Sequence, residues 1–186
     1  MGERRGGTRE RIQQVALELF AEKGYENTAL REVSERLEIT RPALYYHFKT
    51  KDDILDSVVA DLTGSMDELI EWARRQPRTV EARRDTLSKI AELLTSQWRP
   101  LIRFAQANQT TMQTHRAGEH MQQRVLALVS LLADPDADLR QQFEARLAVF
   151  ALILGNVPFI FNLDVPEERL SEISLGVATK LVSNDT

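Results

Sequence analysis

Apolar residues recur at three- and four-residue intervals along almost the whole chain of 186 residues. This spacing places apolar side chains on one face of an α-helix, whereas a half-buried strand needs alternation with period two, which no stretch sustains. The chain is therefore predicted to be all-α. The expected helices are nine and lie near residues 8–23, 29–37, 40–48, 50–76, 79–97, 100–110, 115–133, 137–162 and 166–182.

Residues that favour helix ends lie where these segments begin and stop. Hydroxyl side chains cap helix N-termini by accepting backbone N–H groups, and Asp53, three residues after a threonine, predicts a capping box with an acid shorter than usual. Gly24 can adopt the left-handed conformation that ends a helix. The predicted N-caps are Thr8, Thr28, Thr40 and Thr50.

The charge is unevenly divided along the chain. The net charge is −4, but residues 1–51 hold ten Lys or Arg and eight Asp or Glu, whereas residues 52–186 hold fourteen and twenty. From Ile39 to Lys51 there is no acidic residue, and Arg41, His47 and Lys49 lie in the same stretch. An acidic chain disfavours a general nucleic-acid binder, but this basic stretch favours one confined to the N-terminal third.

The two short helices near residues 29–37 and 40–48 are separated by a tight turn, which predicts a helix-turn-helix motif. In that motif the second helix enters the major groove of DNA. Leu44 and Phe48 form its buried pair at i, i+4, so Tyr45 and Tyr46 must partly face outward. Contacts with a duplex would explain two exposed aromatic rings in so small a domain.

Residues Gly24 to Lys51 resemble the DNA-binding domain of TetR/AcrR-type transcriptional repressors. The matching residues are Gly24, Tyr25, Thr28, Val33, Ile39, Thr40, Leu44, Tyr45, Tyr46, His47, Phe48 and Lys51. The likeness covers about 45 residues with the first helix included, and the rest of the chain matches in general plan only. It implies a three-helix DNA-binding domain in residues 1–51 and a helical effector-binding and dimerisation domain in residues 52–186.

The resemblance also implies roles for individual residues. Arg41, Pro42 and Ala43 would read base edges from the start of the recognition helix, whereas Tyr46, His47 and Lys51 would anchor it on phosphates. Thr28 would cap the preceding helix and is a candidate for a phosphate contact. The complete set of DNA-binding candidates is Thr28, Arg31, Thr40, Arg41, Pro42, Ala43, Tyr45, Tyr46, His47 and Lys51.

Three residues depart from the family pattern. Ala29 replaces a second hydroxyl, and Leu37 replaces a small residue, so the packing of the two helices can shift. Glu38 stands where glycine is usual, and glycine suits a turn with positive φ. Glutamate there implies either backbone strain or a slightly different turn.

The helix expected at residues 137–162 has two apolar seams, one of which includes Val149 and Leu152. One seam needs the core of its own domain, and the other is expected to face the same helix of a second chain. The resemblance implies the same homodimer, bound to a palindromic operator. The predicted dimer-interface residues are Phe143, Leu147, Leu154, Leu170, Ile173, Val177 and Leu181.

The resemblance further implies a pocket for an unidentified small-molecule effector in the C-terminal domain. Aromatic residues and methionines at helical spacing are more often plain core, and this alternative stays open for each candidate. Trp72 is expected to be a surface or packing residue. The candidate ligand-binding residues are Met66, Ile70, Trp98, Arg103, Phe104, Asn108, Met112, Met121, Phe150 and Asn156.

Other functional classes find no support in the sequence. The chain has no cysteine, and no catalytic triad or phosphate-binding glycine loop is present, so neither an enzyme nor a cofactor is predicted. His115 and His120 would point about 140° apart on a helix, so no metal site is predicted. The apolar run at residues 147–163 is too short for a membrane span, and no signal peptide is seen, so a cytoplasmic location is expected.

The sequence thus predicts a ligand-responsive, homodimeric repressor that binds DNA through its third helix. Two alternatives remain: a helix-turn-helix regulator that works without a ligand, and a helical module that uses the motif for protein contacts.

Overall fold

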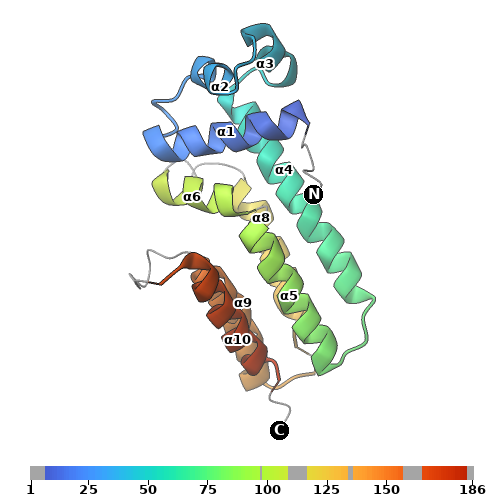
Figure 1. Ribbon diagram of the computed structural model, residues 1–186. Helices are drawn as coiled ribbons and strands as arrows, with labels where there is room; N and C mark the ends of the chain where they lie inside the picture. The colour runs from blue at the N-terminus through green and yellow to red at the C-terminus, as the bar shows by residue number, and fades with distance from the viewer. Residues whose placement is uncertain (1–6, 97, 109–116, 134–135, 157–164, 184–186) are drawn as a thin grey trace, which may run out of the picture. The chain divides into compact units, whose positions relative to one another are not determined.

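Nine α-helices and no strand make up the part of the chain described by the computed structural model, which comprises residues 7–96, 98–108, 117–133, 136–156 and 165–183 (Figure 1). The predicted all-α class is confirmed. Most helix ends lie within three residues of the predicted ones, because the apolar periodicity carries the signal. The helices are α1 Thr8–Lys23, α2 Leu30–Arg36, α3 Arg41–His47, α4 Lys51–Arg74, α5 Val80–Ser96, α6 Arg99–Ala107, α8 Ala117–Leu131, α9 Leu139–Gly155 and α10 Glu167–Leu181.

Two of the predicted N-caps are confirmed, at α3 and α4. Thr40 Oγ1 accepts the N–H of Ala43 at 3.3 Å. Thr50 Oγ1 accepts the N–H of Asp53 at 3.0 Å, and the Asp53 carboxylate accepts the N–H of Thr50 at 2.8 Å, which completes the capping box. The Thr50 N–H, followed by that of Lys49, lowers the pKa of Asp53, because both donate to its charged form.

The predictions for Thr8 and Thr28 as caps are wrong. Thr8 is the first residue of α1, and Gly7 precedes it without a side-chain cap. Ala29 is the N-cap residue of α2, and its N–H is accepted by the Glu32 carboxylate at 2.9 Å. A glutamate three residues into the helix therefore binds the N-cap N–H, although Ala29 itself has no oxygen on its side chain.

The chain divides into two compact units. Unit 1 comprises Met1–Leu62 and Pro100–Gly118, and unit 2 comprises Thr63–Arg99 and Glu119–Thr186. The division falls inside α4, and most of α6 belongs to unit 1. The sequence-predicted domains, residues 1–51 and 52–186, are functional assignments and stay a prediction.

Unit 1 is built around the apolar face of α1. Ile12, Ala16 and Phe20 are fully buried, and α1 packs against α2, which in turn contacts α3. Gln13 is also buried and joins α1 to the first half of α4. Its amide donates to Ser57 Oγ at 2.5 Å and to the Asp61 carboxylate at 2.6 Å.

Unit 2 is organised by the packing of α9 along α10, with α5 against both (Figure 1). Close approach of α9 and α10 is possible because Gly155 has no side chain. A Cβ atom at Gly155 would lie 2.1 Å from Ser174 Oγ and 2.2 Å from its Cβ, well inside van der Waals contact. A Cβ atom added at Gly176 would meet no heavy atom of the described residues within 4 Å.

The two apolar seams predicted for α9 differ in burial. Val149 and Leu152 lie in the core of unit 2. Leu139, Phe143 and Phe150 on the other seam are exposed, because the described part of unit 2 does not cover them. The helix predicted at residues 137–162 ends at Gly155, and Asn156 is its C-cap residue. Residues 157–164 lie outside the described residues.

The apolar run at residues 147–163 is therefore described only in its first part. Among the helices that the structure describes, none is both long enough and apolar enough to cross a membrane.

The close approach of α9 and α10 yields a stability prediction. Replacement Gly155→Ala is expected to lower the free energy of unfolding by about 1–3 kcal/mol, because the added methyl group must displace Ser174. Urea unfolding followed by circular dichroism measures the change.

Gly64→Ala is the matched control, because Gly64 lies in α4 and a Cβ atom added there would meet nothing within 4 Å. It is expected to be neutral or stabilising by up to about 1 kcal/mol, as alanine favours helix. Equal effects of the two replacements would contradict the close approach.

Candidate nucleic-acid interface

The third helix, α3, presents a surface that unit 1 does not use for its own core. Leu44 and Phe48 are buried, as their i, i+4 spacing predicts. Tyr45 and Tyr46 are 43% and 83% exposed. Two large rings in contact with water on a seven-residue helix indicate a surface prepared for a partner.

The first turn of α3 is exposed as well. Arg41, Pro42 and Ala43 all face solvent, directly after the Thr40 cap. Pro42 lies in the first turn, where its missing N–H breaks no helical hydrogen bond. Within the described part of the chain, Arg41 has no hydrogen bond or ion pair, so its guanidinium is available to a ligand.

The C-terminal end of α3 carries further polar groups. His47 is half-buried, and its ring meets the ring of Tyr46 edge-on at 5.3 Å between centroids. The Lys49 ammonium donates to the carbonyl of Tyr45. Lys49 is absent from the predicted set of DNA-binding residues, although its place in the acid-free stretch was a signal for including it.

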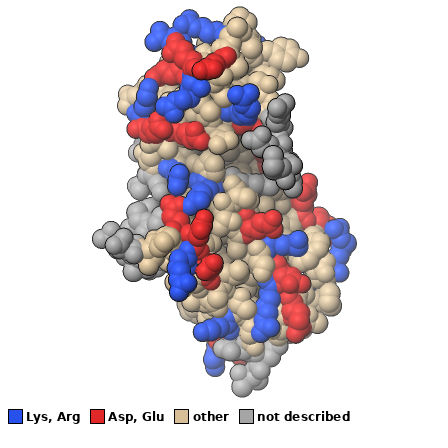
Figure 2. Space-filling view, in the orientation of Figure 1, with Lys and Arg blue, Asp and Glu red and all other residues tan. Residues whose placement is uncertain are grey.

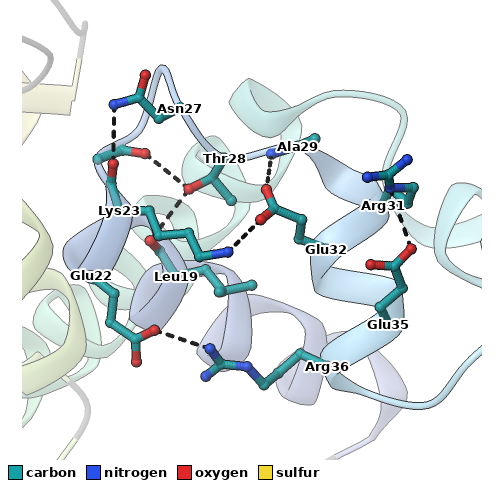
Figure 3. Close-up of polar contacts among 11 residues, drawn as sticks. Leu19, Glu22, Lys23, Asn27, Thr28, Ala29, Arg31, Glu32, Glu35 and Arg36 are labelled. Carbon is teal, nitrogen blue, oxygen red and sulfur yellow. Dashed lines mark hydrogen bonds and ion pairs between the residues drawn. The ribbon is translucent and has the colours of Figure 1, made fainter.

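The second helix is fixed on α1 by ion pairs at the surface (Figure 3). Lys23 pairs with Glu32, and Arg36 pairs with Glu22 at 3.0 Å. Such exposed pairs contribute at most about 1 kcal/mol each, but they define which face of α2 turns away from α1. Arg31 on α2 is exposed and lies 3.3 Å from Glu35, one helical turn further on.

Thr28 has a structural role in place of the predicted one. Its side chain is 2% exposed, and its hydroxyl donates to the carbonyls of Gly24 at 2.9 Å and Leu19 at 3.3 Å (Figure 3). Leu19 lies near the end of α1, and Gly24 is the residue that directly follows the helix. Thr28 thus closes the end of α1, and its hydroxyl points into the unit.

Lys51 likewise contacts its own unit. Its ammonium donates to the carbonyls of Tyr25 at 2.5 Å and Glu26 at 3.4 Å, and lies 4.5 Å from the centre of the Tyr25 ring. The Tyr25 hydroxyl donates to Asp52, and burial together with this bond raises the pKa of Tyr25. Lys51 and Asp52 at the start of α4 therefore hold the turn that leads into α2.

Two predicted ligand residues, Phe104 of α6 and Asn108 just after that helix, belong to this same cluster. The Phe104 ring is fully buried and lies 5.9 Å from the rings of Phe20 and Tyr25. The Asn108 side chain accepts the N–H of Tyr25 at 2.7 Å and donates to the carbonyl of Phe20 at 2.9 Å. Both side chains are engaged inside unit 1, their assignment as pocket residues stays a prediction, and nearby Arg103 is exposed.

The other candidate ligand residues that the structure describes differ in their surroundings. Met66 and Ile70 are buried in the core of unit 2. Phe150 is exposed, and Asn156 follows the last residue of α9 and donates to the carbonyl of Leu152 at 2.8 Å. Among the residues that the structure describes, the buried indole N–H of Trp98 has no hydrogen-bond partner.

Some of the predicted residues fall where the structure gives no description. Met112 and His115 lie outside the described residues, and so do the side chains of Met121 and His120.

The predicted dimer-interface residues separate by their position on the helices. Phe143 and Leu147 of α9 are exposed, and so are Ile173 and Val177 of α10. Leu154 and Leu181 are half-buried. Leu170 is instead buried, because it shares a face of α10 with Ser174 and Ala178, which unit 2 covers.

The turn between α2 and α3 carries backbone strain at Glu38. Its φ is +55°, the one positive value for a non-glycine residue in the described part of the chain. This conformation settles the alternative that the sequence leaves open: the turn keeps its glycine-like shape, and Glu38 bears the steric cost. The Glu38 carboxylate is exposed, two residues before Thr40.

On the face drawn in Figure 2, basic and acidic side chains are interspersed in small groups and form no single large basic patch. The positive character near α3 is therefore local. It arises because no acid lies between Ile39 and Lys51.

Comparison with known proteins places this geometry among bacterial regulators. Residues 12–58 match the family model described as bacterial regulatory proteins, tetR family. The chain is 34% identical over 88 residues to the HTH-type transcriptional regulator AcrR of Shigella flexneri, and 29% identical over 104 residues to the HTH-type transcriptional repressor BepR of Brucella suis. These alignments cover 47% and 55% of the chain but only 38% and 50% of the two relatives.

A solved structure extends the likeness in fold to nearly the full chain. The TetR-family transcriptional regulator PfmR from Thermus thermophilus matches with a TM-score of 0.64 at 20% identity, and the match covers 97% of this chain and 98% of that one. At this identity the likeness concerns the fold. It confirms the predicted arrangement of an N-terminal helix-turn-helix region followed by further helices.

The strained turn yields a second stability prediction. Replacement Glu38→Gly is expected to raise the free energy of unfolding by about 1 kcal/mol, because glycine adopts positive φ without a Cβ clash. Chemical denaturation of both proteins measures the gain.

Glu38→Gln is the control, since it removes the charge and keeps the Cβ atom. It is expected to leave stability close to that of the original chain. A glycine variant no more stable than the glutamine variant would show that the turn is unstrained.

Proposed function

Because the chain belongs to the TetR/AcrR family, we propose that it is a DNA-binding transcriptional regulator that inserts α3 into the major groove. The observation that carries this proposal is the surface of α3. Arg41 at the start of this short, capped helix is exposed and its side chain has no partner in the described part of the chain, and the two tyrosines of the helix are exposed as well.

Within this proposal the residues of α3 divide by the contacts open to them. Arg41 reads a guanine edge, since a guanidinium donates to two acceptors of that base at once, and Pro42 and Ala43 pack on thymine methyl groups. Tyr45, Tyr46 and His47 contact bases or phosphates. Thr40, Lys49 and Arg31 supply phosphate contacts, which position the helix without selecting sequence.

Two of the predicted DNA contacts take an indirect part. Thr28 and Lys51 are bonded to carbonyls of the α1–α2 connection, and through it they position α2 and α3. Their replacement would therefore weaken binding to all sequences together.

We further propose that the regulator is a homodimer that binds a palindromic operator. Phe143 and Leu147 of α9, together with Ile173 and Val177 of α10, are exposed apolar side chains on two helices that pack against each other. Such a stripe is costly to leave in water, and a two-fold axis would pair it with its copy. The paired half-sites would lie about 34 Å apart or at a related spacing.

We also propose that the regulator is a repressor, that a small-molecule effector releases it from DNA, and that it is located in the cytoplasm. An effector would bind more tightly to a conformation of the dimer in which the spacing of the two α3 helices does not match the half-sites of the operator. Of the predicted pocket residues that the structure describes, some are buried and others are exposed, so the residues that would contact the effector are not specified further.

The proposal predicts a specific effect of Arg41. In a gel shift against genomic fragments selected by the protein, Arg41→Ala is expected to weaken the preferred site by about 10-fold or more, because one bidentate base contact is worth about 1–3 kcal/mol. Random DNA of equal length should lose less. Affinity for both should fall steeply with salt, as phosphate contacts require.

Arg74→Ala removes the same charge from an exposed residue of unit 2, where Arg74 pairs with Glu71, and should leave both affinities unchanged. Equal loss for preferred and random DNA would refute base reading by Arg41. Absence of DNA binding by the original chain would favour a helical protein-interaction module.

The dimer proposal predicts that a charge in the stripe separates the protomers. Phe143→Glu is expected to change the mass in light scattering from twice 21.2 kDa to 21.2 kDa, because two-fold symmetry brings two carboxylates into one interface. Leu126→Glu is the matched control. Leu126 is 55% exposed on α8, against 60% for Phe143, and it lies outside the stripe. A dimer that persists with Phe143→Glu would exclude this interface.

A further inference from the structure

A groove of about 320 Å³ lies between α4 and α5, within unit 2. Its residues include Glu68, Leu69 and Trp72 from α4 and Lys89, Glu92 and Leu93 from α5. None of them is among the predicted effector-binding residues. Its volume lies at the lower end of the range for small-molecule sites.

The spacing of these residues explains why they meet. Glu68 and Trp72 are four residues apart on α4, and Lys89 and Leu93 are four apart on α5. Residues at i and i+4 lie on one face of a helix, so each helix contributes a row to the groove. Leu69 is buried, which gives the groove an apolar part.

The indole face of Trp72 already binds a cation. The Lys89 ammonium lies 4.7 Å from the centre of the Trp72 ring. Attraction between an ammonium and an aromatic face depends on the quadrupole of the ring and holds equally for a cation that arrives from solution.

Two carboxylates border the same groove. Glu68 and Glu92 are exposed, and their side chains have no ion pair or hydrogen bond within the described parts of the chain. Lys89 is the one basic residue among the lining residues, so the groove has an excess of negative charge. Lys89 contacts the ring instead of either carboxylate.

We propose that this groove binds an amphipathic organic cation, in which an ammonium or amidinium group is attached to an apolar or aromatic body. The cationic group takes the place of Lys89 over Trp72, the carboxylates of Glu68 and Glu92 offset its charge, and the body contacts Leu69 and Leu93. An anion would meet two carboxylates and the negative face of an indole. A hydrated metal ion would gain little from an aromatic wall.

The test uses the small number of tryptophans in the chain. There are two, Trp72 and Trp98, so Trp98→Phe leaves Trp72 as the single tryptophan, which is excited at wavelengths where the three tyrosines do not absorb. Benzyltrimethylammonium chloride is the probe, with sodium chloride at equal ionic strength and benzyl alcohol as controls. We expect a saturable change in Trp72 fluorescence with the probe and none with either control.

Three variants then assign the change to the groove. Lys89→Met is expected to lower the dissociation constant several-fold, because it removes the competing cation. Glu68→Gln combined with Glu92→Gln is expected to raise it by about ten-fold. Lys180→Met, which removes an exposed lysine from α10, is the charge-matched control and should leave it unchanged.

The proposal is overturned if the probe gives no saturable change up to about 10 mM, if Lys89→Met weakens binding, or if the double glutamine variant binds like the original. Circular dichroism establishes that each variant is folded. Should Trp98→Phe not fold, calorimetric titration of the original chain and of Trp72→Leu gives the same comparison. The titrations contain no DNA, so their result is independent of the proposed regulatory function.

Discussion

The connection between α1 and α2 depends on one buried tyrosine. The Tyr25 ring needs an apolar surrounding, which Phe104 provides, but its hydroxyl needs a partner, which is Asp52. Its N–H is bound by Asn108 and its carbonyl by Lys51. The hydroxyl, the N–H and the carbonyl of this residue are thus each bound by a side chain distant in the sequence, and the position of α2, and with it α3, follows from the turn.

This arrangement explains why the start of α4 carries opposite charges side by side. Lys51 must reach a carbonyl, and Asp52 must accept a hydroxyl, from adjacent positions in the first turn. Asp53 is used differently, as part of the cap with Thr50. Three consecutive charged residues therefore bind three separate groups: a carbonyl, a hydroxyl and the N-cap residue. The local sequence alone does not predict these roles, because it resembles that of any solvent-exposed helix start.

The local part of the fold could be predicted from the sequence because its causes are local. Periodic apolar residues determine where helices lie, and the Thr40 and Thr50 caps require only the next three residues. The exposure of Tyr45 and Tyr46 also follows, once Leu44 and Phe48 are assigned to the core. The recognition surface is accordingly the part of the candidate site that spacing describes well.

The remainder depends on contacts between distant segments, which spacing does not encode. Asn108 binds Tyr25, which lies 83 positions away in the sequence. The sequence alone therefore does not distinguish an asparagine that binds the protein's own backbone from one that contacts a ligand. Thr28 has the sequence of a cap, but its hydroxyl donates to the carbonyls of Leu19 and Gly24, and Ala29 is the N-cap residue of α2. The groove at Trp72 is lined by residues of both α4 and α5, and the residues of either helix alone do not predict a groove.

The strained turn has a consequence for how this protein can vary. With φ at +55°, any side chain other than that of glycine, or to a lesser degree asparagine or aspartate, meets nearly the same steric cost at position 38. Exchange of one such residue for another therefore leaves the backbone energy almost constant. Position 38 is a place where charge next to α3 can evolve, in either sign, while the fold beneath it stays the same.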